Sequence, residues 1–195
     1  MYRPGNKLRF SINAPVTLAF VGLCFAAQLL NVLTGGASNR LVFSVYRSPL
    51  LNPLTWVRSF CHVFGHADWS HLMGNMIYIL ILGPMLEEKY GAKNLILVIA
   101  VTALSTGVFS QLLFPRVMLL GASGVVFAFI LMSSITVRED HTIPLTFVLV
   151  ALIYLGQQVL QGLFTRDNVS QSTHLIGGAV GTISGFLLNR KPWKR

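Results

Sequence analysis

Six apolar runs separated by polar segments are the feature that most limits what this sequence can fold into. They cover residues 15–33, 71–86, 94–114, 117–137, 143–163 and 174–188. Most approach the ~20 residues that an α-helix needs to cross a bilayer. With 53% hydrophobic and only 11% charged residues, the chain is too apolar for an ordinary soluble protein. The sequence therefore predicts an all-α membrane protein with six transmembrane helices, the fourth starting near residue 121.

A single membrane domain covering residues 1–195 is expected, because no repeat or Pro/Ser-rich linker divides the chain. The basic N-terminal segment and the run after it resemble a secretory signal. Since the run 15–33 is close to spanning length, we expect it to remain as an uncleaved first helix. Residues 34–70 mix Pro, Arg, Trp and Phe, a composition that favours a long, structured first loop lying at the membrane interface.

The distribution of Lys and Arg predicts how the helices are oriented. Ten of these 15 residues fall on the side of the termini and five on the opposite side. The first group is Arg3, Lys7, Arg9, Lys89, Lys93, Arg138, Arg190, Lys191, Lys194 and Arg195; the second is Arg40, Arg47, Arg58, Arg116 and Arg166. By the positive-inside rule, both termini are expected to be cytoplasmic. The net charge of +9 forms no basic stripe with interleaved aromatics, so nucleic acid is not an expected partner.

Two of the runs, 71–86 and 174–188, are too short to cross the membrane alone. At ~1.5 Å per residue they reach roughly 24 and 22 Å, against a hydrocarbon core of ~30 Å. The polar residues just before them must therefore lie at membrane depth, where they need a wet cavity or burial in protein. Because the second, fourth and sixth helices run in the same direction, one cavity opening to the outer side is expected to hold His71, Ser123 and His174.

The stretch Gly121-Ala122-Ser123-Gly124 places a hydroxyl between two glycines. This absence of side-chain bulk favours close helix packing, and it equally allows a substrate to approach the hydroxyl. A buried serine needs a base to act as a nucleophile, and His174 is the candidate. The two residues would form the minimal pair for acyl transfer.

Donors for an oxyanion can also be identified. His71 and Asn75 are four residues apart, hence on one helical face, and both side chains can donate hydrogen bonds. The Ser123 N–H, at a helix start, adds a third donor. The acidic residues on this side, Asp68 and Asp167, fall in outer loops, so we expect a Ser-His dyad without a carboxylate. The sequence also lacks HExxH, and no aspartate pair lies within the runs.

Two alternatives remain open at this point. His62 and His66 are four residues apart and, with His71 and Asp68, have ligand types that suit a metal site. Hydrogen bonding within the first loop is the interpretation we prefer for both, so that no metal or other cofactor is expected. The intramembrane histidines also fit a proton relay, but the predicted helices contain no acidic partner and no evident inverted repeat.

Three motifs together resemble the rhomboid intramembrane serine proteases. Gly121-Ala122-Ser123-Gly124 is similar to their GxSG motif, residues 174–181 to the HxxGxxxG of their last helix, and residues 71–75 to the HxxxN of their second helix. The order and helix placement agree over nearly the whole chain, most closely with the compact six-helix bacterial members. Each motif alone is weak evidence, whereas the ordered set is specific.

The resemblance implies roles for individual residues. Ser123 would be the nucleophile and His174 the general base, while His71, Asn75 and the Ser123 amide would form the oxyanion hole. Phe127 occupies the place of a tyrosine that stacks on the catalytic histidine. Gly121, Gly124, Gly177 and Gly178 would lie around the site. The GxxxG ladder of Gly177, Gly181 and Gly185 is expected to pack the last helix closely against the fourth.

Two further segments match the family's pattern less directly. The Trp-Arg pair of the family's first loop appears here as Trp56-Val57-Arg58, with one residue interposed. Glu87 and Gly91 resemble a structural motif at the inner end of the second helix.

The function implied by the resemblance is a serine endopeptidase of the bacterial inner membrane. Its substrates would be transmembrane or juxtamembrane segments of other membrane proteins, cleaved through an acyl-enzyme, and its other partner would be membrane lipid. The alternative is a non-catalytic membrane protein of the same fold that binds client helices. Such a relative is expected to lack the serine or the histidine, and this sequence has both.

Overall fold

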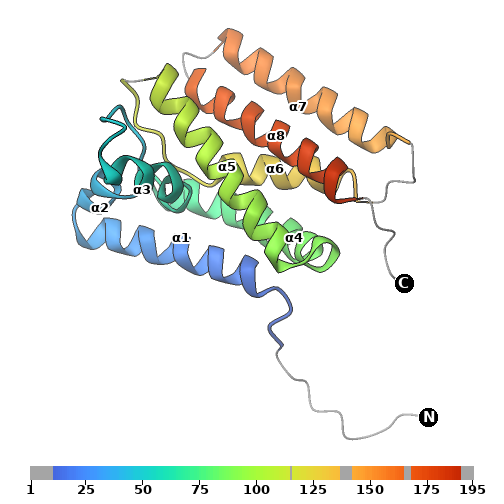
Figure 1. The fold of residues 1–195 in the computed structure, drawn as a ribbon, viewed down its shortest axis with the longest axis horizontal. Helices are drawn as coiled ribbons and strands as arrows, with labels where there is room; N and C mark the ends of the chain where they lie inside the picture. Colours follow the sequence, from blue (N-terminus) through green and yellow to red (C-terminus); the bar gives the residue numbers. More distant parts are fainter. Residues whose placement is uncertain (1–10, 115, 137–141, 165–167, 190–195) are drawn as a thin grey trace, which may run out of the picture.

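The computed structural model describes residues 11–114, 116–136, 142–164 and 168–189, and it is built from helices (Figure 1). Their bounds are α1 Pro15–Leu33, α2 Ala37–Leu41, α3 Pro53–Cys61, η1 His62–Phe64, α4 Trp69–Tyr90, α5 Ala92–Leu113, α6 Ser123–Ser133, α7 Leu145–Phe164 and α8 Asn168–Leu188. Strand-like pairing in these ranges is limited to one antiparallel bridge between Val45 and Leu119. The predicted all-α class is confirmed.

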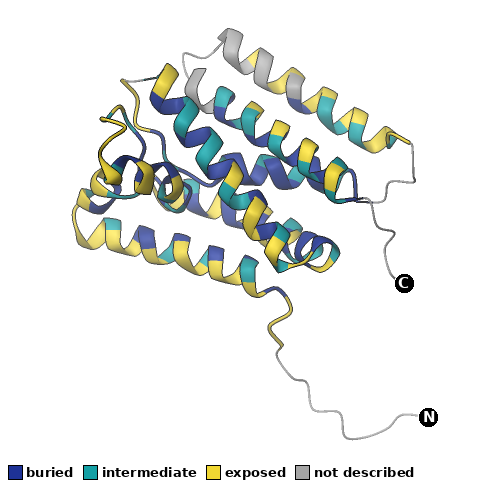
Figure 2. Cartoon of the chain, viewed as in Figure 1, coloured by how far each residue is buried: buried dark blue, intermediate teal, exposed yellow. Residues whose placement is uncertain are grey.

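Within the described residues, three helices are long and apolar enough to cross a membrane: α1, α4 and α5. Shorter apolar helices are formed by α6 and by the first part of α7. Many large apolar side chains face outward, for example Leu33 (74% exposed) and Ile81 (65%). Figure 2 shows such exposed positions along the outer faces of α1 and α7. This surface fits a membrane protein, while the count of six spanning helices remains a prediction.

One predicted helix start is wrong, and the apolar run 117–137 is helical only from Ser123. Residues 117–120, expected to lie in or next to the fourth helix, are not helical; Leu119 instead pairs with Val45 in the first loop, and α6 begins only at Ser123. The last helix begins at Asn168 and not at residue 174. Hydropathy missed its first turns because polar residues there, such as Gln171 and Thr173, are buried in the protein.

The helix predicted over 71–86 extends in both directions, from Trp69 to Tyr90. Asp68 caps its start by accepting a hydrogen bond from the His71 N–H (2.8 Å). Gly91 ends it with a backbone φ of +84°, a conformation that favours glycine. The chain reverses there into α5.

The short helix α6 occupies the centre of the bundle and packs against α4, α5 and α8 (Figures 1 and 2). Its residues are among the most buried of the chain, including Ala128 and Phe129. Because α6 ends inside the protein, the carbonyls after its last turn need donors. Asn189 supplies one to Ile135 (2.9 Å), and Lys89 supplies another to Thr136. Neighbouring helices thus fix the inner end of α6.

Glycines let α8 lie directly on the α6 backbone. A Cβ added at Gly177 would stand 2.9 Å from the Gly124 Cα, and one added at Gly181 would stand 2.6 Å from the Ala128 Cα. Real Cβ atoms essentially never come so close. The predicted close packing of the last helix on α6 is therefore present.

A buried carboxylate joins the N-terminus of α1 to the end of α4. Glu87 is 5% exposed and accepts hydrogen bonds from the Val16 N–H, the Thr17 N–H and the Thr17 hydroxyl, each at 2.9 Å. These amides belong to the first turn of α1, which has no partners within its own helix. The negative charge also complements the positive end of the helix dipole. Glu87 therefore holds two helices in register.

We expect Glu87→Ala to destabilise the protein by about 2–3 kcal/mol, because two buried donors and one part-buried donor lose a charged acceptor. Thermal unfolding of the purified protein in detergent measures the effect. The adjacent Glu88→Ala is the matched control, since Glu88 is exposed and makes none of these contacts. Equal melting temperatures for the two variants would contradict the assignment of Glu87 as the cap of α1.

Candidate active site

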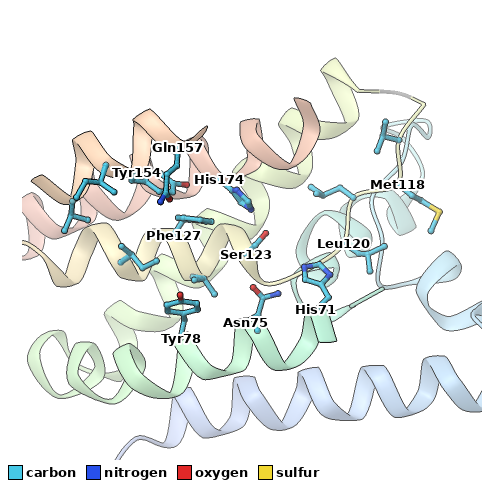
Figure 3. A pocket seen from close by; sticks show the side chains of 17 residues that line it. His71, Asn75, Tyr78, Met118, Leu120, Ser123, Phe127, Tyr154, Gln157 and His174 are labelled. Atoms are coloured by element: carbon cyan, nitrogen blue, oxygen red, sulfur yellow. The ribbon is translucent and has the colours of Figure 1, made fainter. Parts of the chain in front are cut away.

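A cavity of about 720 Å³ opens between α4, α6, α7 and the second turn of α8. All four residues expected to carry the chemistry line it: His71 and Asn75 from α4, Ser123 from α6 and His174 from α8. Figure 3 shows the Ser123 hydroxyl lying between the His174 ring on one side and the His71 and Asn75 side chains on the other. Segments far apart in sequence thus meet at one place.

The turn before Ser123 depends on Gly121. Its φ of +127° is a conformation that side-chain-bearing residues rarely adopt. A Cβ at this position would also stand 2.8 Å from Cε1 of the His71 ring. Gly121 therefore lets the chain reverse in contact with His71 and place Ser123 at the first position of α6.

Ser123 offers both an oxygen and an amide to the cavity. As the first residue of α6, it has no partner for its N–H within the helix. Among the described residues, neither this N–H nor the hydroxyl makes a hydrogen bond. Ser123 and His174 thus share the cavity without a direct hydrogen bond between them. Catalytic hydrogen bonds are often long in structures without substrate and shorten when it binds.

His174 belongs to a stack of three aromatic rings. The centroids of the Phe127 and His174 rings lie 4.2 Å apart with 41° between the ring planes, and the Tyr154 ring of α7 lies at the same centroid distance from Phe127, at 37°. The expected contact between Phe127 and His174 is present. The contact of Tyr154 with Phe127 is not predicted by the sequence, because a tyrosine in an apolar run has no signal that tells a ring stack from a lipid contact.

Asn75 carries an unused hydrogen-bond donor. The residue is 7% exposed, and its Nδ2 atom is buried without a hydrogen-bond partner among the residues that the structure describes. Buried polar groups are almost always hydrogen-bonded, so an orphan donor in a cavity calls for an explanation. His71 stands one turn earlier on the same face of α4, held through its backbone by Asp68. Together they present donors to the space beside Ser123.

The supporting glycines occupy tight places around this centre. A Cβ at Gly124 would meet the methyl groups of Thr106 (3.3 Å) and Thr173 (3.4 Å). At Gly178 it would stand 3.3 Å from the Tyr154 ring. Gly177 faces the Gly124 backbone, as described above. These contacts set how close α8, and so His174, comes to α6.

His62 and His66 do more than hydrogen-bond within the first loop. Their Nδ1 atoms do face loop carbonyls, Ser59 for His62 (3.1 Å) and Phe64 for His66 (3.2 Å). Their Nε2 atoms reach the helical bundle: His62 pairs with the Thr106 hydroxyl (3.2 Å), and His66 lies 3.4 Å from the Ala122 amide. Such contacts over 44 and 56 residues carry no sequence signal.

The electrostatics of these two rings favour their neutral forms. Burial lowers the pKa of His62 to about 4. Burial, with a further contribution from nearby His71, lowers the pKa of His66 to about 4. In the part of the chain that the structure describes, no group of three His, Cys, Asp or Glu side chains could hold a metal ion.

The interrupted Trp-Arg pair stabilises the first loop. Arg58 is 7% exposed, donates from Nε to the Leu41 carbonyl (2.9 Å) and lies over the Tyr46 ring at 4.4 Å. Trp56 donates from its indole to the Leu50 carbonyl (3.0 Å). Both side chains therefore tie α3 to the preceding chain, despite the extra residue between them.

Comparisons with known proteins agree with this arrangement. The model of the Rhomboid domain matches residues 53–191. The rhomboid protease GlpG of Yersinia pseudotuberculosis is 28% identical over 178 residues, or 88% of this chain and 62% of that protein. Rhomboid-like protein 11, a chloroplastic protein of Arabidopsis thaliana, is 26% identical over 151 residues, or 70% of this chain and 54% of its own length. An uncharacterized protein of Mycobacterium leprae is 29% identical over 203 residues, or 96% of this chain and 78% of that protein.

The matched region begins at the start of α3 and includes every residue of the cavity. The chain spans little more than half the length of the Arabidopsis relative and 62% of the Yersinia protein. Because the domain match extends over most of its residues, the chain belongs to the rhomboid family.

Proposed function

We propose that this protein is an intramembrane serine endopeptidase that cleaves transmembrane or juxtamembrane segments of other membrane proteins. The observation that carries the proposal is one cavity lined by Ser123, His174 and an unpaired, buried Asn75 amide. A nucleophile, a base and an oxyanion donor are the parts that acyl transfer needs. Membership of a family that includes a named protease supports the same reaction.

The first half of the reaction follows from these positions. The Ser123 Oγ attacks the scissile carbonyl carbon while His174 takes the hydroxyl proton. The carbonyl π-electrons move to oxygen, and this oxyanion accepts hydrogen bonds from the Asn75 Nδ2, His71 and the Ser123 N–H. When the intermediate collapses, the peptide C–N bond breaks and His174 gives its proton to the leaving amine. The product is an acyl-enzyme on Ser123.

In the second half, water entering the cavity hydrolyses the ester. His174 takes a proton from water, the hydroxide adds to the acyl carbon, and Ser123 Oγ leaves with the proton returned by His174. The ring stack with Phe127 and Tyr154 limits how far the imidazole can rotate between the two steps. No cofactor takes part in this sequence of steps.

The proposal includes a location and an orientation. Six helices, α1 and α4 to α8, cross the bacterial inner membrane, with both termini in the cytoplasm and the cavity open to the outer side. The excess of Lys and Arg on the inner side supports this orientation. Substrates of this enzyme are membrane proteins whose cleaved segment reaches the cavity from the lipid.

A fluorophosphonate probe on the detergent-purified protein tests the proposal. We expect covalent modification at Ser123, mapped by mass spectrometry, together with cleavage of a transmembrane reporter in proteoliposomes. A non-catalytic protein that binds client helices would retain the reporter without either result. Absence of both labelling and cleavage in folded protein would contradict the enzymatic proposal and favour a non-catalytic protein that binds client helices.

Asn75→Ala is expected to lower kcat by roughly 10²–10³-fold, the usual cost of removing one oxyanion donor. KM should change little, because the donor acts mainly on charge that develops in the transition state. Initial rates on a reporter in proteoliposomes separate the two constants. Asn94→Ala makes the same chemical change at the inner end of α5, where Asn94 bonds the Tyr90 carbonyl, and should leave kcat unchanged. A full-rate Asn75→Ala enzyme would exclude Asn75 from the oxyanion hole.

A further inference from the structure

We propose that His66, in the first loop, is a positioning residue that fixes the Ser123 turn by accepting a hydrogen bond from the Ala122 amide. This inference rests on the proposed function, because it concerns the amide donor of the oxyanion hole. His66 does not line the cavity and does not touch the reacting atoms. It acts through the backbone that leads into α6.

Two successive amides of the turn are bonded by the first loop. The Gly121 N–H donates to the His62 carbonyl (3.0 Å), and the Ala122 N–H donates to His66 Nε2 (3.4 Å). The next amide, that of Ser123, has no partner among the described residues. The loop therefore holds the peptide groups before Ser123 and leaves the Ser123 N–H available for the oxyanion.

His66 is itself held on several sides. The residue is 0% exposed, and its backbone carbonyl accepts a hydrogen bond from the side-chain Nδ2 of Asn39 (2.9 Å). Its ring meets the His71 ring edge-on, with 5.2 Å between the centroids. A histidine fixed in this way can transmit the position of the loop to the turn. Replacement of its acceptor atom should leave the rest of the loop in place.

The hydrogen bonds determine the tautomer of His66. A proton on Nδ1 donates to the Phe64 carbonyl (3.2 Å) and leaves the Nε2 lone pair to accept from Ala122. The charged groups that face the ring are His71, which opposes its protonation, and Asp68, which favours it. Because burial outweighs Asp68 and the pKa lies near 4, the ring is neutral at pH 7. The accepting form is therefore the form present.

Loss of this acceptor should affect the chemical step more than substrate binding. Without it, the Ala122 peptide can rotate, and the Ser123 N–H and Oγ move with it. Misplacement of reacting groups by about 1 Å costs roughly 10²-fold in rate. Substrate contacts elsewhere in the cavity remain, so KM should change little.

The test compares His66→Leu with His66→Gln in the full chain. Leucine removes the acceptor, whereas the Gln Oε1 can reach the Nε2 position and accept from Ala122. We expect His66→Leu to lower kcat and the rate of fluorophosphonate labelling by roughly 10–100-fold with KM within about twofold. His66→Gln should restore kcat to within about fivefold of the wild type. Amide hydrogen exchange at Ala122 should be faster in His66→Leu than in the other two proteins.

Thr55→Val is the control for general damage to the loop. Thr55 is 1% exposed and donates to the Pro49 carbonyl (2.8 Å), and among the described residues it makes no hydrogen bond to the turn. This variant should lose stability and keep kcat. If His66→Leu kept wild-type kcat, or if His66→Gln lost as much kcat as His66→Leu, the inference would be wrong. Should the wild type show neither cleavage nor labelling, the proposed function fails by itself. Ala122 exchange then decides the inference alone, and equal exchange in all three proteins overturns it.

Discussion

Ser123→Ala and His174→Ala should each reduce cleavage of a transmembrane reporter by roughly 10⁴–10⁶-fold, the loss seen when a member of a serine-protease catalytic unit is removed. The double variant should be no worse than either single one. The reason is that the nucleophile and the base act in the same step, so that once either is removed the other no longer contributes to the rate. Single-turnover rates measured in proteoliposomes with excess enzyme can detect rate losses of this size.

Ser133→Ala is a suitable control for the serine variant. It makes the same change on the same helix, where the hydroxyl only bonds the Ile130 carbonyl of the preceding turn (2.8 Å). Ser123→Ala should keep the wild-type melting temperature within a few degrees, since the Ser123 hydroxyl makes no hydrogen bond with a described residue. If the losses of the two single variants multiplied in the double variant, Ser123 and His174 would act independently, and the dyad would be the wrong mechanism.

The residues of the cavity could be predicted because membrane burial makes polar side chains conspicuous. A histidine or serine at membrane depth needs a cavity or a partner, and helix direction says at which end it lies. His71 and Asn75 lie on one face of α4 through simple helical geometry. These local rules were enough to bring Ser123, His174, His71 and Asn75 to one cavity.

The support of that cavity could not be predicted, because it depends on contacts between distant segments. Apolar residues 117–120 read as helix, yet Leu119 pairs with Val45 of the first loop. The ring nitrogens of His62 and His66 reach Thr106 and Ala122 across the fold. Hydropathy and spacing describe one segment at a time, so they predict residues that line the cavity and miss the contacts that the first loop makes with the bundle.

The interface between α8 and α6 gives the second large effect. Gly181→Ala should lower the free energy of unfolding by about 3 kcal/mol, at the upper end of the usual cost of overpacking. The new methyl group would meet the Ala128 carbonyl and stand 2.6 Å from its Cα, and a backbone cannot move aside as a flexible side chain can. Because His174 lies two turns earlier on α8, we also expect cleavage to fall by roughly 10²-fold as the imidazole shifts away from Ser123.

Gly156→Ala on α7 is the matched control, since no atom of the residues that the structure describes lies within 4 Å of a Cβ added there. That variant should be neutral or more stable by up to about 1 kcal/mol, because alanine loses less entropy than glycine in a helix. Thermal unfolding in detergent and reporter cleavage in proteoliposomes measure both properties for each variant. If Gly181→Ala had the same melting temperature as the wild type, α8 would be able to move away from α6 at little cost in free energy. The position of His174 would then have to be set by the ring stack with Phe127 and Tyr154 instead of by backbone contact.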